Sequence, residues 1–184
     1  MSVAAVCLAL SLGGDAARDW CRYDRAGLEA GQLWRLLTGH LVHLGWGHLW
    51  PNLLALLLIG GLVEEFLSPL EWLAVIVVAA LGIDAGLYVL ETEVPWYVGL
   101  SGVLHGVVAC GALLMLTERH VRIGGALAVG LAAKLTFEQV SGPVPFTQAS
   151  VGGAVIVAAH LYGAASGVVI GALLSFRRHR RAQI

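Results

Sequence analysis

Four polar side chains with the chemistry of acyl transfer occur within or beside apolar segments of the 184-residue chain: Ser101, His160, His48 and Asn52. A serine beside a histidine base is an activated nucleophile, and histidine and asparagine side chains donate hydrogen bonds that stabilise an oxyanion. Polar groups inside apolar spans are costly, which makes them candidates for a functional site. The alternative is that all four only form hydrogen bonds between helices.

The composition defines the surroundings of these residues. Apolar residues make up 58% of the chain and charged residues 12%, and the mean hydropathy is +0.81. Soluble domains average roughly 25% charged residues, so the chain is expected to be an integral membrane protein. Disorder, a collagen-like repeat, a coiled coil and a disulfide-stapled scaffold are excluded. The net charge of −1 gives no indication of a nucleic-acid partner.

The apolar runs predict a single all-α membrane domain over residues 1–184 with six spanning helices. A span needs about 20 apolar residues. The expected spans are approximately residues 2–18, 47–63, 70–90, 97–117, 123–140 and 149–176. The first run is short and resembles a signal peptide in length, but no Lys or Arg precedes its apolar core, which favours a short first helix.

Basic residues predict the orientation of these spans. The tail over residues 177–184 holds four arginines, and two more lie in the loop over residues 117–122. The positive-inside rule places both segments in the cytoplasm. Both chain termini are then cytoplasmic, and the loop over residues 19–46 lies outside.

Depth arithmetic brings Ser101 and His160 together. Ser101 lies 16 residues before Thr117, and His160 lies 16 residues before Phe176, each counted from the cytoplasmic end of its span. At 1.5 Å per residue both lie about 24 Å above the cytoplasmic boundary of a ~30 Å hydrocarbon core. A serine and a histidine at one depth, on helices that run the same way, can meet near the outer boundary.

Glycines supply the means of close approach. A small-residue stripe lets two helix backbones pack tightly. The glycines around Ser101 are Gly99, Gly102 and Gly106, and those on the face of His160 are Gly163, Gly167 and Gly171. Residues 99–102 also open a helix, where unpaired N–H groups and the positive dipole end suit an oxyanion.

Other polar residues are expected to be structural. Lys134 and Glu138 are i,i+4 neighbours that neutralise one another. Asp84 caps an interhelical network or marks a water pocket. The cysteines at positions 7, 21 and 110 are expected to be free.

No metal site or cofactor is expected. His40, His43 and His48 lie close in sequence, but no Cys or carboxylate completes a ligand set at a convincing spacing. A structural role for His43 and an oxyanion role for His48 are the favoured interpretations.

The motifs around these residues resemble those of rhomboid intramembrane serine proteases. Residues 99–106, GLSGVLHG, are similar to the GxSG motif of the fourth rhomboid helix. Residues 159–163, AHLYG, continuing to Gly167, resemble the sixth-helix histidine and its glycine stripe. His43 with residues 48–52 matches the second-helix HxxxN element, and Trp34-Arg35 resembles the WR pair of the first loop.

This resemblance implies a six-helix rhomboid-like bundle with a catalytic dyad and no acidic third member. Ser101 would be the nucleophile and His160 the general base. His48, Asn52 and the Ser101 backbone N–H would form the oxyanion hole. Trp34 and Arg35 would hold the first loop at the membrane interface.

One departure indicates a branch of the family. Many rhomboid proteases have a tyrosine four residues after the serine, stacked on the histidine, and this chain has His105. GLSGVLHG and AHLYGAASG look like the rhombosortase branch, which implies a bacterial inner-membrane enzyme with its active site near the periplasmic face. Its membrane-anchored substrates would carry a C-terminal Gly-Gly motif, a hydrophobic helix and a basic tail. His105 is expected to orient His160.

Two other functions stay open. One is a general rhomboid protease that cuts single-span proteins, and the other is a non-catalytic rhomboid-like protein that binds membrane helices. A carrier or channel is disfavoured because no charged pathway crosses the spans. The sequence does not rank the first loop against the fifth helix as the gate for substrate, nor water against an amine as the acceptor.

Overall fold

The structure is a computed structural model that describes residues 3–145, 153–181 and 183. Helices dominate it, and a two-stranded antiparallel sheet joins two loops. The elements in chain order are α1 (Val3–Leu12), α2 (Gly14–Cys21), β1 (Tyr23–Asp24), α3 (Arg25–Glu29), α4 (Arg35–Thr38), α5 (Trp46–Val63), the 3₁₀ turn η1 (Glu64–Phe66), α6 (Pro69–Val89), β2 (Trp96–Tyr97), α7 (Ser101–Thr117), α8 (Val121–Ser141) and α10 (Val157–Arg181).

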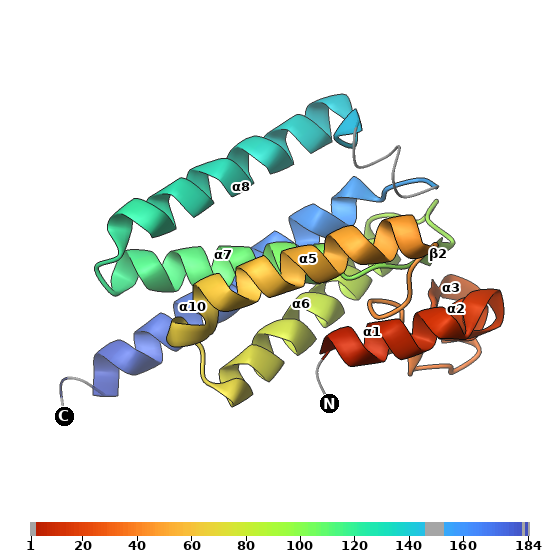
Figure 1. Cartoon of the computed structure of the whole chain (residues 1–184), viewed down its shortest axis with the longest axis horizontal. Coiled ribbons are helices and arrows are strands. Elements are labelled where there is room, and N and C mark those ends of the chain that lie inside the picture. Colours follow the sequence, from red (N-terminus) through yellow and green to blue (C-terminus); the bar gives the residue numbers. More distant parts are fainter. Residues whose placement is uncertain (1–2, 146–152, 182, 184) are drawn as a thin grey trace.

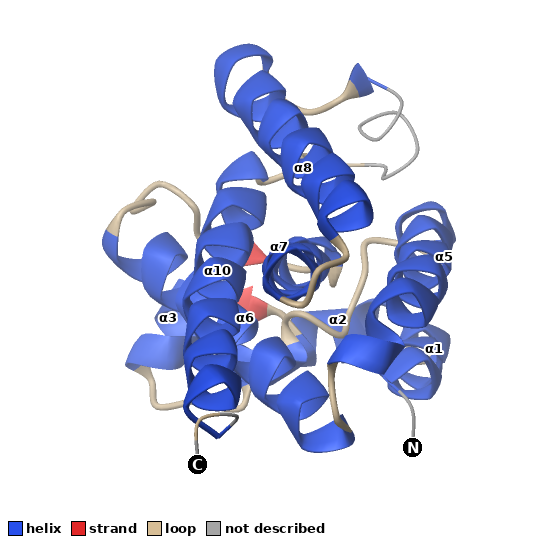
Figure 2. Ribbon diagram, turned by 90° about the vertical axis from the view of Figure 1, so that its left-hand side faces the viewer, coloured by secondary structure: helices blue, strands red, loops and turns tan. Residues whose placement is uncertain are grey.

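Helix α7 is the central element of the bundle. Figure 2 shows it nearly end-on, with α5, α6, α8 and α10 around it. Its buried residues run from Gly102 to Met115, and α10, α8 and α6 pack along it. Helix α8 stands further out, along one side of the bundle (Figure 1). The surrounded position of α7 places its first residue, Ser101, among the neighbouring helices.

Within the part of the chain that the structure describes, three helical segments are long and apolar enough to cross a membrane: Trp46–Phe66, Pro69–Val89 and Val157–Arg181. Helices α1 and α7 are apolar but shorter, and α8 is as long as α6 but less apolar. The all-α membrane architecture agrees with the prediction from composition, while the count of six spans stays a prediction.

The first predicted span, residues 2–18, is divided between two helices in the structure, α1 and the beginning of α2. The helix is interrupted between α1 and α2 at Gly13, and Gly14 has a φ of +59°. That left-handed conformation suits glycine and interrupts a regular helix. The outer loop predicted over residues 19–46 accordingly holds several short elements: the end of α2, then β1, α3 and α4.

Two later spans differ from prediction at their outer ends. The span predicted over residues 97–117 begins as a helix only at Ser101, because residues 96–97 form β2 and Gly99 has a φ of +118°. The span predicted over residues 149–176 begins as α10 at Val157, and residues 149–152 lie outside the described residues. Helix α10 continues to Arg181, into the predicted tail, where basic side chains suit a helix C-terminus.

The loops at the Ser101 end of the bundle are joined by backbone and side-chain hydrogen bonds. Strand β1 pairs with β2, with Tyr23 opposite Tyr97. The buried Arg35 donates to the carbonyl oxygens of Asp19 and Arg22 at 3.0 and 2.8 Å, and Trp34 stacks on the ring of a second tryptophan, Trp20, at 5.3 Å between centroids. Trp34 and Arg35 therefore make contacts within the loop, as a structural role requires.

A buried hydrogen-bonding contact connects the loop that follows α4 to α6. Nε2 of His40 lies 3.2 Å from a carboxylate oxygen of Asp84, and both side chains are only 2% exposed. Asp84 therefore makes a structural contact, but its partner is a loop residue in place of the second helix that the interhelical interpretation expected.

At the end of the bundle remote from Ser101, Arg178 of α10 connects α10 with η1, α6 and the end of α7. Its guanidinium contacts the carboxylates of Glu71, at 2.9 Å, and Glu118, and it donates to the carbonyl oxygen of Phe66. Glu71 also forms a capping box with Ser68 at the start of α6. The basic end of α10 and the α7–α8 connection thus lie at one end of the molecule, remote from Ser101.

Candidate active site

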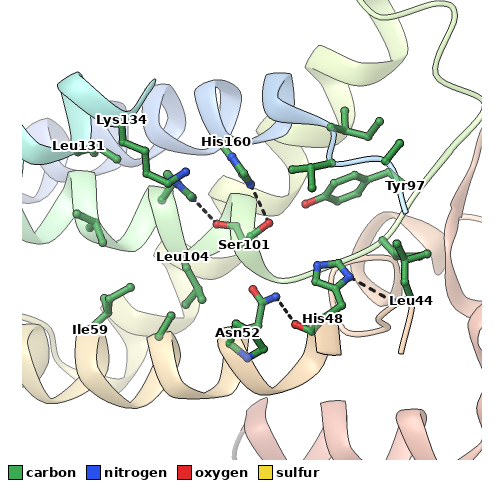
Figure 3. Close-up of a pocket in the computed structure, with 18 of the residues that line it drawn as sticks. Leu44, His48, Asn52, Ile59, Tyr97, Ser101, Leu104, Leu131, Lys134 and His160 are labelled. Carbon is green, nitrogen blue, oxygen red and sulfur yellow. Dashed lines mark hydrogen bonds between the residues drawn. The ribbon is translucent and has the colours of Figure 1, made fainter. Parts of the chain in front are cut away.

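Ser101 and His160 meet at the end of the bundle that lies opposite Arg178. Ser101 is the first residue of α7, and His160 lies in the first turn of α10. Oγ of Ser101 is 2.9 Å from Nε2 of His160, a hydrogen-bond distance, and the histidine is 3% exposed. Figure 3 shows the two side chains pointing toward one another. A nucleophile and a base are therefore in place for proton transfer.

Glycines allow the two helices to come this close. A Cβ built at Gly163 would overlap the carbonyl oxygen of Gly102, and one at Gly167 would overlap that of Gly106. In the other direction, a Cβ at Gly102 would lie 2.9 Å from the carbonyl oxygen of Ala159. The predicted glycine stripe is thus the contact surface between α7 and α10.

The backbone before Ser101 is shaped around His48. Gly99 has a φ of +118°, and a Cβ there would lie 2.7 Å from Cε1 of His48. Nδ1 of His48 accepts a hydrogen bond from the backbone N–H of Leu44 at 3.4 Å. Because Nδ1 is the acceptor, the ring carries its proton on Nε2, which makes that nitrogen a donor.

Asn52 follows one turn after His48 on α5 and is also buried. Its amide nitrogen donates to the carbonyl oxygen of His48 at 2.8 Å. A side-chain amide has two N–H groups, so one donor remains for a substrate oxygen.

A cavity of about 620 Å³ connects these groups. Its lining comes from α5, α7, α8, the start of α10 and the segments that precede α7 and α10, and it includes Ser101, His160, His48 and Asn52. Most of the other lining residues are apolar, such as Ile59. The cavity has room for an extended peptide segment beside the serine.

His105 packs against the candidate base without facing the serine hydroxyl. Its ring stacks on that of His160, with 4.2 Å between centroids and 13° between planes. Its Nδ1 lies 2.7 Å from the carbonyl oxygen of Ser101, to which it donates. The stacking is consistent with the expected orienting role.

His43 is a buried neighbour of His48 and lies in the loop between α4 and α5. The two rings are edge-on, with 5.0 Å between centroids, and neither ring nitrogen of His43 has a hydrogen-bond partner among the described residues. Burial and the nearby His48 lower the pKa of His43 to about 3, so its ring is neutral at physiological pH. This agrees with a packing role.

Sequence reasoning missed one member of the cluster, Glu138. Oε2 of Glu138 lies 2.8 Å from Nδ1 of His160, and Oε1 lies 2.5 Å from Nζ of Lys134. The expected pairing of Lys134 with Glu138 is present, but it occupies only one carboxylate oxygen. The implied absence of an acidic partner for His160 is therefore contradicted by this geometry.

The comparisons with known proteins decide the family. A model of the Rhomboid domain matches residues 30–177, most of the chain. The chain belongs to the rhomboid family. It is also similar to the Bacillus subtilis (strain 168) protein named "Putative rhomboid protease YdcA", with 27% identity over 164 residues that cover 89% of this chain and 78% of that protein.

One group of three side chains in this rhomboid protein has the composition of a metal site. Among the described residues, His105, Glu138 and His160 have potential ligand atoms within 4.8 Å of one another. A metal ion binds imidazole in the ring plane, and the two nearly parallel rings do not direct their in-plane nitrogens to one point. His160 also already uses both nitrogens. The group is better described as a hydrogen-bonded pair, Glu138 and His160, with the ring of His105 stacked on the histidine.

Proposed function

We propose that this rhomboid protein is an intramembrane serine endopeptidase of the rhombosortase type. The observation that carries the proposal is the 2.9 Å contact between Ser101 Oγ and His160 Nε2 beside a cavity with oxyanion donors. The protease name of the Bacillus relative supports the class of activity.

The proposed reaction begins with attack of Ser101 Oγ on a substrate carbonyl carbon, while Nε2 of His160 takes the hydroxyl proton. The oxyanion accepts hydrogen bonds from the Ser101 backbone N–H, Nε2 of His48 and the amide of Asn52. His160 then protonates the leaving amine as the C–N bond breaks. Water or an amine acceptor resolves the acyl-enzyme and regenerates the serine.

The proposed substrate is a membrane-anchored protein with a Gly-Gly motif, a hydrophobic helix and a basic tail. Two glycines make helix unwinding easy and allow an extended backbone to approach Ser101 closely. The residues that favour this substrate class are His105, at the position where many rhomboids have tyrosine, and the AHLYGAASG segment.

The proposed location is the bacterial inner membrane, with both termini cytoplasmic and Ser101 near the periplasmic face. The basic end of α10, where Arg178 lies, supports a cytoplasmic assignment for that end. Exposed tryptophans on the elements around Ser101 suit the opposite membrane–water interface: Trp20, Trp34, Trp46, Trp50 and Trp96.

The test is co-expression in bacterial membranes with a single-span reporter that ends in Gly-Gly, a hydrophobic helix and a basic cluster. We expect the wild-type chain to shorten this reporter and the Ser101→Ala variant to leave it intact. A matched reporter with Val-Val in place of Gly-Gly is expected to remain uncut. The mass of the product distinguishes a free carboxylate from an amide formed with an acceptor.

Other results would redirect the assignment. Ser101-dependent cleavage of both reporters would support a general rhomboid protease that acts on single-span proteins. If a membrane-inserted wild-type chain cuts neither reporter, nor a generic helix substrate, the protease proposal is wrong and a helix-binding role becomes the better one.

The oxyanion donors give a separate prediction. Asn52→Ala and His48→Ala are each expected to lower kcat by about 10²- to 10³-fold, because each removes one donor to the developing charge. The measurement is the cleavage rate of the Gly-Gly reporter by purified variants in detergent. An unchanged kcat in both variants would show that the oxyanion lies elsewhere.

A further inference from the structure

The carboxylate of Glu138 is the most deeply buried charged group at the site. Its side chain is fully buried, whereas that of Lys134 is 36% exposed. Among the described residues of α8, only Gly124 and Glu138 are buried. A surface ion pair with Lys134 would not require this burial. The buried contact of this carboxylate is its hydrogen bond with His160.

The hydrogen bond to Glu138 determines which nitrogen of His160 carries the proton. A carboxylate only accepts hydrogen bonds, so Nδ1 of His160 must be protonated to donate across the 2.8 Å contact. In the neutral ring Nε2 is then the acceptor, and it faces Ser101 Oγ at 2.9 Å. This is the arrangement that a general base for Ser101 needs.

We propose that Glu138 is a positioning residue that completes a Ser101–His160–Glu138 triad spread over α7, α10 and α8. The inference rests on the proposed protease function and departs from the dyad that family resemblance implies. Glu138 holds His160 in the competent tautomer and stabilises the imidazolium that forms when Nε2 takes the serine proton. The proton stays on His160 and is not passed to the carboxylate.

Lys134 lowers the free-energy cost of burying the Glu138 carboxylate. A lone carboxylate at membrane depth is costly, and an opposite charge offsets part of that cost. The Nζ of Lys134 binds Oε1 at 2.5 Å and leaves Oε2 to His160. One face of the His160 ring stacks on the ring of His105, with 4.2 Å between the ring centroids. Packing by His105 and hydrogen bonding by Glu138 thus restrict different motions of the base.

The experiment measures how fast a fluorophosphonate probe labels Ser101 in the purified full chain in detergent. The serine Oγ displaces fluoride from phosphorus, so the rate reports nucleophile activation without a peptide substrate. Glu138→Gln keeps the side-chain size but removes the charge, and we expect labelling to slow roughly 10²- to 10⁴-fold. Glu138→Asp, which restores the carboxylate, is expected to recover part of that rate.

A matched double variant separates catalysis from charge balance. Lys134→Met with Glu138→Gln removes both charges together, so no unpaired charge is left buried. We expect the double variant to unfold within a few degrees of wild type and to label as slowly as Glu138→Gln alone. Glu91→Gln, which changes a carboxylate bound to Tyr162, is the control expected to label at the wild-type rate.

Introducing Glu138→Gln into a His160→Ala chain tests whether Glu138 acts through the histidine. There the Glu138→Gln change is expected to slow labelling no further, because residues that act as a unit are strongly non-additive. An equal loss in both backgrounds would overturn the triad and indicate a purely structural role. A Glu138→Gln chain that labels at the wild-type rate would also overturn it.

The two proposals fail in distinguishable ways. If Ser101 labels readily in wild type and in Glu138→Gln alike, the protease function stands and the triad alone is wrong. If the folded wild-type chain neither labels at Ser101 nor cuts a reporter, the protease function and the triad are both wrong.

Discussion

Replacement of His160 by alanine is expected to lower the rate of Ser101 labelling by about 10⁴- to 10⁶-fold. His160 is the side chain that contacts Oγ, at 2.9 Å, with a nitrogen free to accept its proton. The measurement is the labelling rate by the fluorophosphonate, with thermal unfolding in detergent as the check on folding. Cleavage of the Gly-Gly reporter should fall in parallel.

His105→Ala is the matched control, because it removes a second buried imidazole from the same cluster. Nδ1 of His105 is bound to the Ser101 carbonyl oxygen, and its ring only stacks on His160. We expect a loss of about tenfold from looser positioning of the base, and His105→Tyr should recover most of it by restoring a stacked ring. If His160→Ala stays active while His105→Ala is inactive, the assignment of the base is reversed.

The contact between Ser101 and His160 could be predicted from the sequence because helices that cross a membrane all run roughly along its normal. Two residues at equal distance from the same boundary share a depth, and small residues beside them show which faces approach. Helix α5, at Trp46–Val63, lies within one residue of the span predicted over 47–63. Helix α6, at Pro69–Val89, likewise lies within one residue of the span predicted over 70–90.

Glu138 satisfied the same depth rule and was nevertheless missed. It lies 16 residues after Arg122, which is at the end of α8 that is predicted to be cytoplasmic, so its predicted depth equals that of Ser101 and His160. Lys134, one turn away, offered a sufficient local partner, and that local pairing hid the long-range one. A carboxylate has two oxygens, so one neighbour does not exhaust its hydrogen bonding. An acidic residue at catalytic depth should therefore be tested against every other polar group at that depth.

The outer loops were beyond prediction for a different reason. Strands β1 and β2 have two residues each, which is too short for any periodic pattern to indicate pairing. The contact between His40 and Asp84 joins residues 44 positions apart in sequence. The break at Gly13 depends on the local backbone conformation, with a φ of +59° at Gly14, where the apolar run gives way to the polar helix α2.

The close approach of α7 and α10 leads to the second large expected effect. Gly163→Ala is expected to slow Ser101 labelling by at least about 10²-fold, because a 1 Å displacement at a catalytic site has effects of this order. The new methyl group would overlap the carbonyl oxygen of Gly102, next to Ser101. Backbone cannot rotate away as a side chain does, so α10 must shift. Overpacking of this kind costs roughly 1–3 kcal/mol of stability, which thermal unfolding in detergent would record.

A graded series makes the prediction specific. Gly167→Ala is expected to have a similar effect, since its methyl group would overlap the carbonyl oxygen of Gly106. Gly171→Ala should be mild, because its Cβ would lie 3.2 Å from Cα of Cys110. Gly61→Ala meets nothing within 4 Å and should be neutral. Equal losses at Gly171 and Gly163 would contradict the explanation.

The series also separates packing from catalysis. Small-residue stripes in membrane helices ordinarily determine association alone. Here the spacing that Gly163 permits also determines the distance from Oγ of Ser101 to Nε2 of His160, at the end of the two helices where both side chains lie. A Gly163→Ala chain that remains folded but labels slowly would show that the glycine sets catalytic geometry. A chain whose labelling falls only in proportion to its unfolded fraction would show that the stripe serves stability alone.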